Sequence, residues 1–440
     1  MTAAASPAPE GRPSASRPHV TTEAIAGVTT FFTMAYIVVV NPSILSTPGT
    51  GITFSGALTA TVLLCFTMTL LMGLYARLPF AVAPGMGING FFTFTLILGR
   101  QVPWQVALGM VFWAGVLFLI LSATPLRATI VKAIPPSLRA ATAVGIGVFL
   151  TFIGLRNAGI VVADPVTLVR LGRLDHRALF MIVALGVTLL LSTRRSPFAF
   201  LAGIFSATAI ALLTGMVALP SQLFSAPDFQ SVFLKLDIWG ALRWALVPAI
   251  VSLLFTDLFD SLSTLIGVAQ ASEMLDADGN PINLKQALIV DSFATLGAGL
   301  AGTSSGTAYI ESAAGINAGG RTGLTSVFTA LCFLPCFFIA PLAAMVPPYA
   351  TASVLVLVGA AMFRSIRAID FGRIEDGLPA FLTIVLIPLT FSITQGILWG
   401  FISHVGLYGL VGRRREVHPV MYALAAVAVG LLVLEHSALS

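Results

Sequence analysis

Carboxylates inside long apolar stretches are the residues of this sequence most able to do chemistry. Asp257 and Asp260 lie in LLFTDLFDSLSTLIG, and their spacing of three residues places both side chains near one face of a helix. Glu311 lies in a second apolar region, and Asp291, in a third, is expected to play a structural role. Acidic side chains within a membrane span are costly and rare, so they are candidates for a transport pathway or a proton relay. Burial favours the protonated form of such a group, which lets proton uptake accompany solute binding.

Two glycine-rich segments far apart in the chain look like copies of each other. AVAPGMGING covers residues 81–90, and TAYIESAAGINAGG covers residues 307–320. Each carries the tripeptide Gly-Ile-Asn, which ends at Asn89 in the first copy and at Asn317 in the second. Each also interrupts an apolar stretch with residues that break a regular helix. Broken spans in corresponding positions of two halves indicate a binding site near the middle of the bilayer.

The geometry expected of these segments indicates which solute would fit. A half-helix that starts near the middle of the bilayer presents free backbone N–H groups and a partial positive charge. Extended pieces ahead of the two half-helices, at Phe80–Ala83 and Thr307–Ile310, would expose both N–H and C=O groups. Donors and acceptors in one plane suit a flat heterocycle. Glu311 and Asp257 are placed to accept hydrogen bonds from its N–H groups. The sequence therefore predicts a transporter with a central site for a small polar solute.

The composition is that of a polytopic membrane protein. Of the 440 residues, 57% are hydrophobic and 9% are charged, whereas soluble domains carry roughly 25% charged residues. Apolar runs recur along nearly the whole chain at the length needed to cross a hydrocarbon core of roughly 30 Å. We expect an all-α protein with fourteen transmembrane segments, near residues 23–41, 55–76, 86–98, 104–122, 138–154, 178–193, 198–216, 244–270, 285–301, 311–319, 322–345, 349–363, 378–393 and 395–411.

A second local match supports an internal duplication. PPSLRAATAVGIG begins at Pro135 and PPYATASVLVLVG at Pro347, and each leads into the fifth span of its half. Seven spans per half is an odd number, so the two halves must be inverted in the membrane.

The distribution of basic residues predicts a cytoplasmic N-terminus. In that orientation most of the 23 basic residues lie on the cytoplasmic side, as the positive-inside rule requires. The cytoplasmic set is Arg12, Arg17, Arg77, Arg127, Lys132, Arg139, Arg194, Arg195, Lys285, Arg321, Arg364, Arg367, Arg373, Arg413, Arg414 and Arg415. The segment Arg156–Arg177, with four arginines on the outer side, is the exception.

The two ends and the cysteines add little chemistry. Residues 1–20 are rich in Ala, Ser and Pro and are expected to form a disordered tail without a cleaved signal peptide. The apolar run Val420–Leu434 is either an interfacial helix or an extra crossing. Cys65, Cys332 and Cys336 lie in apolar runs and are expected to be small core residues. We expect no metal ion and no cofactor.

Four long motifs, in order, resemble the nucleobase–cation symporter-2 (xanthine/uracil permease) superfamily, in its adenine/guanine/hypoxanthine permease branch. They are TTEAIAGVTTFFTMAYIVVVNPSIL from Thr21, FAVAPGMGIN from Phe80, FTDLFDSLSTLIGVA from Phe255 and GTSSGTAYIESAAGINAGGRTGLTS from Gly302. The resemblance covers about residues 20–411 and implies proton-coupled uptake of purine bases (adenine, guanine and hypoxanthine) across the bacterial inner membrane. It also implies elevator-like movement of a core domain against a gate domain, and a homodimer formed through the gate.

The resemblance divides the chain into domains and assigns roles to the site residues. The divisions are a tail (1–20), core (21–122, spans 1–4), gate (138–216, spans 5–7), core (244–345, spans 8–11), gate (349–411, spans 12–14) and C-terminal tail (412–440). The implied roles are an essential carboxylate at Asp257, a base-holding carboxylate at Glu311, a polar residue after the first break at Asn89, a supporting acid at Asp260 and site-lining backbone near Met86 and Ile310. Proton coupling is expected of Asp257, Glu311 and Asp260.

Three other functions are weighed against this one. An anion transporter of the same architecture, for sulfate or bicarbonate, would use the facing helix N-termini, but two carboxylates repel an anion unless they are protonated. A channel would not need the duplication. An intramembrane enzyme would need a nucleophile–base pair, which the sequence lacks. Ser261 and Ser263 depart mildly from the family pattern, which leaves the preferred base open.

Overall fold

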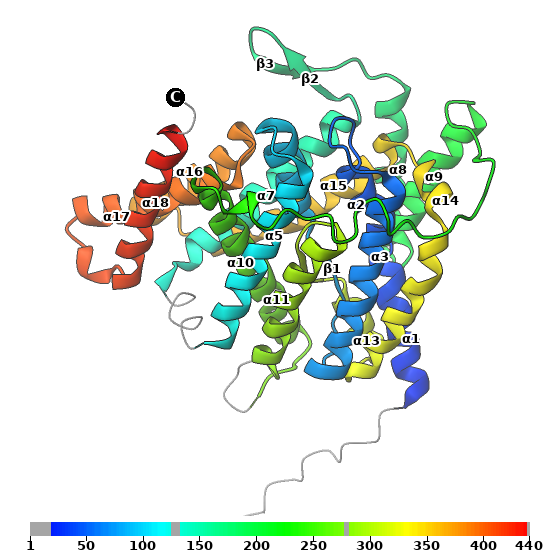
Figure 1. The fold of residues 1–440 in the computed structure, drawn as a ribbon, viewed down its shortest axis with the longest axis horizontal. Helices are drawn as coiled ribbons and strands as arrows, with labels where there is room; N and C mark the ends of the chain where they lie inside the picture. Colours follow the sequence, from blue (N-terminus) through cyan, green and yellow to red (C-terminus); the bar gives the residue numbers. More distant parts are fainter. Residues whose placement is uncertain (1–18, 125–132, 277–280, 438–440) are drawn as a thin grey trace, which may run out of the picture.

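The computed structural model describes residues 19–124, 133–276 and 281–437, and Figure 1 shows them as a bundle of helices. The first helix begins at Val20, the last residue of the predicted tail. Residues 1–18 of that tail lie outside the described residues, and so do Arg127, Lys132 and the last three residues of the C-terminal tail; the basic residues Arg12 and Arg17 are among the first eighteen.

The helices follow the expected spans closely. The described helices of the first half are α1 (Val20–Met34), α2 (Ile37–Leu45), α3 (Phe54–Leu71), α4 (Met86–Gly90), α5 (Trp104–Ala123), α7 (Pro136–Asn157), α8 (His176–Thr193) and α9 (Ala199–Leu213). Those after it are α10 (Val247–Ala271), α11 (Leu284–Ala301), α12 (Ser312–Asn317), α13 (Gly323–Phe333), α14 (Ala340–Ala344), α15 (Pro348–Phe363), α16 (Ile374–Thr390), α17 (Ile393–Leu410) and α18 (Pro419–Ser437). Wider π-helical turns, η1 (Met72–Ala76) and η2 (Phe91–Gly99), extend α3 and α4, and the 3-10 turn η6 (Arg364–Ala368) follows α15.

The protein is a mostly helical membrane protein. Within the described ranges, seven helical stretches are long and apolar enough to span a bilayer, and four further apolar helices are shorter. One of the shorter ones, Met86–Gly99, coincides with the predicted half-helix near residues 86–98. The count of fourteen spans and the division into core and gate stay predictions.

Two short strands join the halves of the chain in the interior. β1 (Val82–Pro84) pairs antiparallel with β4 (Gly306–Ala308), in the register Val82 to Ala308. Backbone hydrogen bonds from Gly85 to Ser305 and from Tyr309 to Ala81 extend the ladder. All six strand residues are buried. Within a hydrocarbon core a backbone N–H or C=O has no water to bond, so each extended piece satisfies the other.

Glycines allow the fifth span of one half to approach its counterpart closely. A Cβ atom built on Gly147 of α7 would lie 2.6 Å from the carbonyl oxygen of Gly359 in α15, and one built on Gly359 would lie 2.3 Å from the carbonyl oxygen of Gly147. Real Cβ contacts are longer, so both positions need glycine for the two backbones to meet. The helices α7 and α15 therefore pack reciprocally around this pair of glycines.

The segment that joins the two halves lies against helices of both. The backbone N–H of Asp237 bonds to Gln105 at the start of α5, and that of Leu234 bonds to Leu300 at the end of α11. The carboxylate of Asp228 accepts a hydrogen bond from Ser55 of α3 at 2.9 Å. The linker is thus anchored on α3, α5 and α11.

Two features lie on the side of the molecule opposite the start of α1 (Figure 1). One is a hairpin of β2 (Val161–Asp164) and β3 (Leu168–Leu171) between α7 and α8. It holds Arg170, one of the arginines that break the charge rule, in an ion pair with Asp164. The other is the end of α18, which packs against α17 and α10. The helix α18 has 19 residues, but its apolar part, Pro419–Val433, is shorter than the seven helical stretches long enough to span a bilayer, so the extra crossing and the interfacial helix both stay predictions.

Candidate functional site

A cavity of about 430 Å³ lies where the two broken segments meet α10. Met86 and Gly87 border it from the start of α4, and residues 307–311 border it from β4 and the turn that follows. The remaining lining residues are Tyr36, Ala143, Phe200, Asp260, Ser263, Thr264, Leu357, Val358, Ala361, Met362, Arg364 and Ser365. The cavity therefore has a polar wall from the broken segments and α10, and a mostly apolar wall from α7 and α15.

Glu311 is the carboxylate at the start of the second half-helix. It occupies the position before α12, and one of its oxygens, Oε1, accepts a hydrogen bond of 2.6 Å from the hydroxyl of Tyr36. Tyr36 lies at the break between α1 and α2 and is buried. Its ring packs against that of Phe200, with ring centres 4.9 Å apart. Sequence reasoning missed both aromatic residues, although Tyr36 is the one tyrosine of the first motif.

Asp260 borders the same cavity from α10. It is close enough to Glu311 for the two carboxylates to repel each other. Ser263 and Thr264, one turn further along α10, add hydroxyl groups to the same wall. The cavity wall thus carries two carboxylates and several hydroxyls. These groups can accept hydrogen bonds from the N–H groups of a flat polar molecule.

Asp257 and Asn89, both predicted to contact the substrate, lie behind the cavity wall. Asp257 is fully buried, and it accepts hydrogen bonds from Ser305 at 2.7 Å and from Thr295. Asn89 is also fully buried, and its side-chain oxygen accepts a hydrogen bond from Ser304. Neither residue borders the cavity in this state. The predicted direct contact between these two residues and a substrate stays a prediction.

The predicted lining residues Met86 and Ile310 do border the cavity. Ile310 is largely exposed to it and to solvent, whereas Met86 is mostly buried.

Asp291 extends the buried acids into a cluster. It is fully buried on α11, close enough to Asp257 and Asp260 for electrostatic interaction. It lies beside the hydroxyl of Ser261 and the backbone of Ala308. Neither of its carboxylate oxygens has a hydrogen-bond partner of good geometry among the described residues. The structural role expected for Asp291 stays a prediction.

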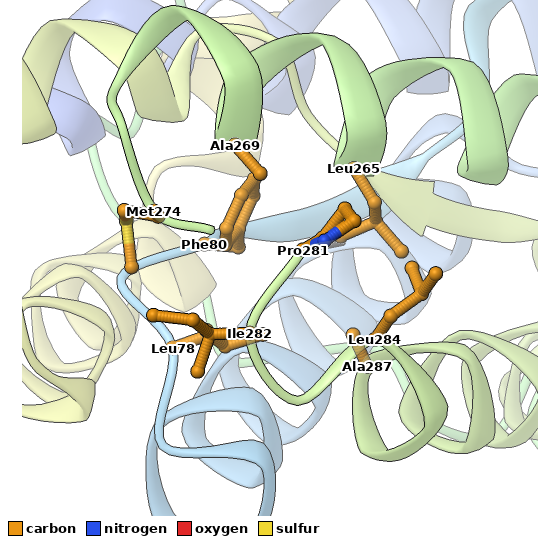
Figure 2. A pocket seen from close by; sticks show the side chains of 9 residues that line it. All are labelled: Leu78, Phe80, Leu265, Ala269, Met274, Pro281, Ile282, Leu284 and Ala287. Carbon is orange, nitrogen blue, oxygen red and sulfur yellow. The ribbon is translucent and has the colours of Figure 1, made fainter. Parts of the chain in front are cut away.

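The other cavities differ in kind from this one. A cavity of about 10 Å³ lies between the end of α10 and the start of α11. Figure 2 shows the nine residues that line it, whose side chains offer only carbon and sulfur atoms. A space of that size holds at most about one water molecule, and its apolar walls give a polar solute no partner. A polar cavity of about 370 Å³ lies between the start of α7 and α17, next to Asp376 and His404. Within the described ranges, no group of three His, Cys, Asp or Glu side chains is placed to hold a metal ion.

Comparisons with known proteins point to one family. A family model described as a permease family matches residues 21–398. A putative permease of Methanocaldococcus jannaschii is 45% identical, with 92% of this chain and 93% of that protein covered. The adenine permease AdeP of Escherichia coli is 40% identical over 92% of this chain and 91% of its own length. The guanine/hypoxanthine permease PbuO of Bacillus subtilis is 39% identical over 92% and 95%.

Solved structures share the fold at low sequence identity. The transmembrane domain of the cyanobacterial bicarbonate transporter BicA superposes with a TM-score of 0.65 at 18% identity, covering 88% of this chain and 98% of that one. The structure of SLC26A9 gives a TM-score of 0.61 at 11% identity, covering 90% and 65%. At these identities the likeness concerns the fold alone.

Proposed function

Because the chain belongs to the nucleobase–cation symporter-2 (xanthine/uracil permease) family, we propose that it takes up purine nucleobases, among adenine, guanine and hypoxanthine, together with protons. Its family members are permeases and not enzymes. The adenine and guanine/hypoxanthine permeases among its relatives support a purine as the solute. The observation that carries the proposal is the pair of carboxylates, Glu311 and Asp260, on one wall of a cavity the size of a small molecule.

The cavity suits a purine in shape and in chemistry. A purine is flat and carries ring N–H groups that need acceptors, and Glu311 and Asp260 supply carboxylate oxygens. Residues 307–310, from β4 and the turn that follows it, border the same wall and bring polar backbone groups close to it. The rings of Tyr36 and Phe200 border the cavity and offer apolar faces to a flat base.

The coupling ion in this proposal is a proton carried by the acids of the site. Glu311 and Asp260 border the cavity and exchange protons with its water, while Asp257 acts from one layer behind through Ser305 and β4. A carboxylate must be protonated or paired to be stable inside a membrane, so loading with proton and base together removes the cost of moving a bare charge.

The movement in this proposal is elevator-type alternating access within a fold of seven plus seven inverted spans. The core comprises residues 21–122 and 244–345, and the gate comprises residues 138–216 and 349–411. The N-terminus lies in the cytoplasm, the chain lies in the cytoplasmic membrane, and a homodimer forms through the gate. Arg364 and Ser365, which follow α15 and border the cavity, are cytoplasmic in this topology, and the proposal therefore takes this conformation as the inward-facing one.

The alternative function is transport of an anion, because BicA, which shares the fold, is named as a bicarbonate transporter. The two carboxylates at the cavity wall disfavour it, because they repel an anion unless both are protonated.

Uptake of labelled hypoxanthine by cells lacking their own purine permeases tests the proposal. Adenine, guanine, xanthine, uracil and sulfate serve as competitors, and the assay is repeated with a protonophore. Uptake that purines inhibit and the protonophore abolishes is the expected result. If well-expressed protein takes up no purine, or if only sulfate inhibits its transport, the purine proposal is wrong and an anion is the substrate to test next.

A further inference from the structure

Arg139, in the first turn of α7, is a charged residue that has no role in the site described above. Its side chain is only partly exposed, and its Nε atom is buried without a hydrogen-bond partner. Among the described residues, no carboxylate lies within ion-pair distance of its guanidinium. By contrast, Arg170, Arg373 and Arg413 each form an ion pair with an acid. A buried Nε atom without a hydrogen-bond partner is costly, so a partner is expected when the protonation of the site changes.

A small cavity of about 20 Å³, next to the substrate cavity, is bordered by both Arg139 and Asp260. Arg139, Thr142 and Ile146 border it from α7, and Thr256, Phe259 and Asp260 border it from α10. Ala143, Asp260, Ser263 and Met362 border both this cavity and the large one. Asp260 is therefore a carboxylate that faces the substrate on one side and the space beside Arg139 on the other.

Other charged groups near α7 are occupied or carry the same sign. The helices α15, α16 and α17 and the turn η6 pack against α7. On α16, Glu375 is bound by Arg413, and Asp376 accepts a hydrogen bond from Tyr408 of α17 and lies near His404. The turn η6 contributes only the cations Arg364 and Arg367. None of the acids Glu311, Asp257 and Asp291 borders the small cavity.

We propose that Arg139 is a positioning residue that pairs with the Asp260 carboxylate once the base has left, and so drives proton release toward the cytoplasm. The proposal rests on the proposed function. The O–H bond of protonated Asp260 breaks, its proton passes to water in the cavity that Arg364 borders, and the carboxylate left behind forms an ion pair with Arg139 across the small cavity. Protonated Asp260 has no such attraction, so the pair forms only after release.

The location of the pair gives this step a direction. Arg139 lies on α7, which the proposed topology assigns to the gate near the cytoplasm, and Asp260 lies on α10 of the core. An ion pair between the two bodies forms only where they are adjacent, as they are in this state. Arg139 therefore favours the deprotonated carrier in the inward-facing state and not in the outward-facing one.

Net uptake and exchange, measured side by side in proteoliposomes, test the inference. Net uptake driven by a proton gradient requires Asp260 to lose its proton, whereas exchange of labelled external base for unlabelled internal base does not. Arg139→Gln is expected to lower net uptake by about 10-fold or more while exchange stays within about 2-fold of wild type, because only the ion pair is lost. Arg139→Lys, which keeps the charge, is expected to restore net uptake.

Arg367→Gln is the matched control, since it removes a charge from η6 without touching either cavity, and it is expected to change neither rate. If Arg139→Gln lowers both rates equally, or neither, or if Arg139→Lys fails to restore net uptake, Arg139 does not act on proton release. Wild-type protein that transports no purine would instead refute the proposed function, so the two failures are distinguishable.

Discussion

The hydroxyl of Tyr36 donates a hydrogen bond of 2.6 Å to Oε1 of Glu311, which is 275 residues further along the chain. The bond joins the break between α1 and α2 to the start of the second half-helix, and both side chains border the cavity. Glu311 lies in the turn before α12, and this bond ties its side chain to the break between α1 and α2. Tyr36 thus connects the first span of the protein to the carboxylate proposed to hold the base.

Tyr36→Phe should weaken the apparent affinity for the base. The substitution keeps the ring that packs on Phe200 and removes only the hydrogen bond to Glu311. A hydrogen bond to a charged group is worth about 1.5–3 kcal/mol, so KM for uptake should rise by roughly 10-fold or more. Tyr75→Phe, at an exposed tyrosine outside the cavity, is the control and should leave KM unchanged. An unchanged KM in Tyr36→Phe would show that Glu311 is held by other contacts.

Glu311→Gln should abolish both binding and uptake of a purine. An amide keeps the shape of the side chain, but it loses the charge and one acceptor oxygen at the cavity wall. Binding is read as thermal stabilisation of the purified protein by hypoxanthine, which wild-type protein should show and the variant should not. Glu273→Gln, at an exposed acid beyond α10, should behave as wild type. Retained stabilisation in Glu311→Gln would place the base elsewhere.

Asp257→Asn should abolish uptake and leave binding largely intact. Asp257 lies behind the cavity wall, bonded to Ser305 and Thr295, so a substitution there removes an acid of the proposed proton path without removing a contact to the base. Thermal stabilisation by hypoxanthine should persist while uptake falls to background in cells with normal amounts of the protein. Loss of binding together with uptake would instead indicate that Asp257 contacts the base directly, as the sequence predicts.

The stability contributed by Asp228 should decline at acid pH. Partial burial works to raise the pKa of Asp228, but hydrogen bonds from Ser231, Ser55 and Thr53 outweigh burial and hold the pKa below its ordinary value of 3.8. The contribution is therefore fully present above that ordinary value and is lost as the pH falls through the lowered one. Asp228→Asn should lower Tm in detergent at about pH 6, and the difference from wild type should shrink by about pH 3. A difference that is constant over this range would mean that the charge is not involved.

The parts of the site that could be predicted from sequence are those with a local signal. Glu311 and Asp260 are acids in apolar runs. The glycine-rich breaks predict the extended pieces before α4 and α12. Those pieces form strands at Val82–Pro84 and Gly306–Ala308, shifted by one or two residues from the predicted ranges. Their pairing with each other depends on how the two halves come together, which no local pattern records.

The order of the acids in depth could not be predicted either. A spacing of three residues places Asp257 and Asp260 near one face of α10, yet one turn of a helix is enough to place Asp260 on the cavity and Asp257 against Thr295 of α11. That difference depends on the position of α11 and β4 around α10. The hydrogen bond from Tyr36 to Glu311 could not be predicted from sequence either, because nothing near Tyr36 in the sequence indicates its partner.

The pairing of β1 with β4 also has a consequence for how the protein is made. Pro84 is synthesised about 220 residues before its partner Gly306. At roughly 5–20 residues per second, the ribosome needs roughly 10–45 s to cover that distance. During this interval the backbone of β1 has no strand to bond, although hydrocarbon does not tolerate bare peptide groups. The first half must therefore wait, shielded by the insertion machinery or held near water, until the second half arrives, and a chain that stops before Gly306 has no route to the folded state.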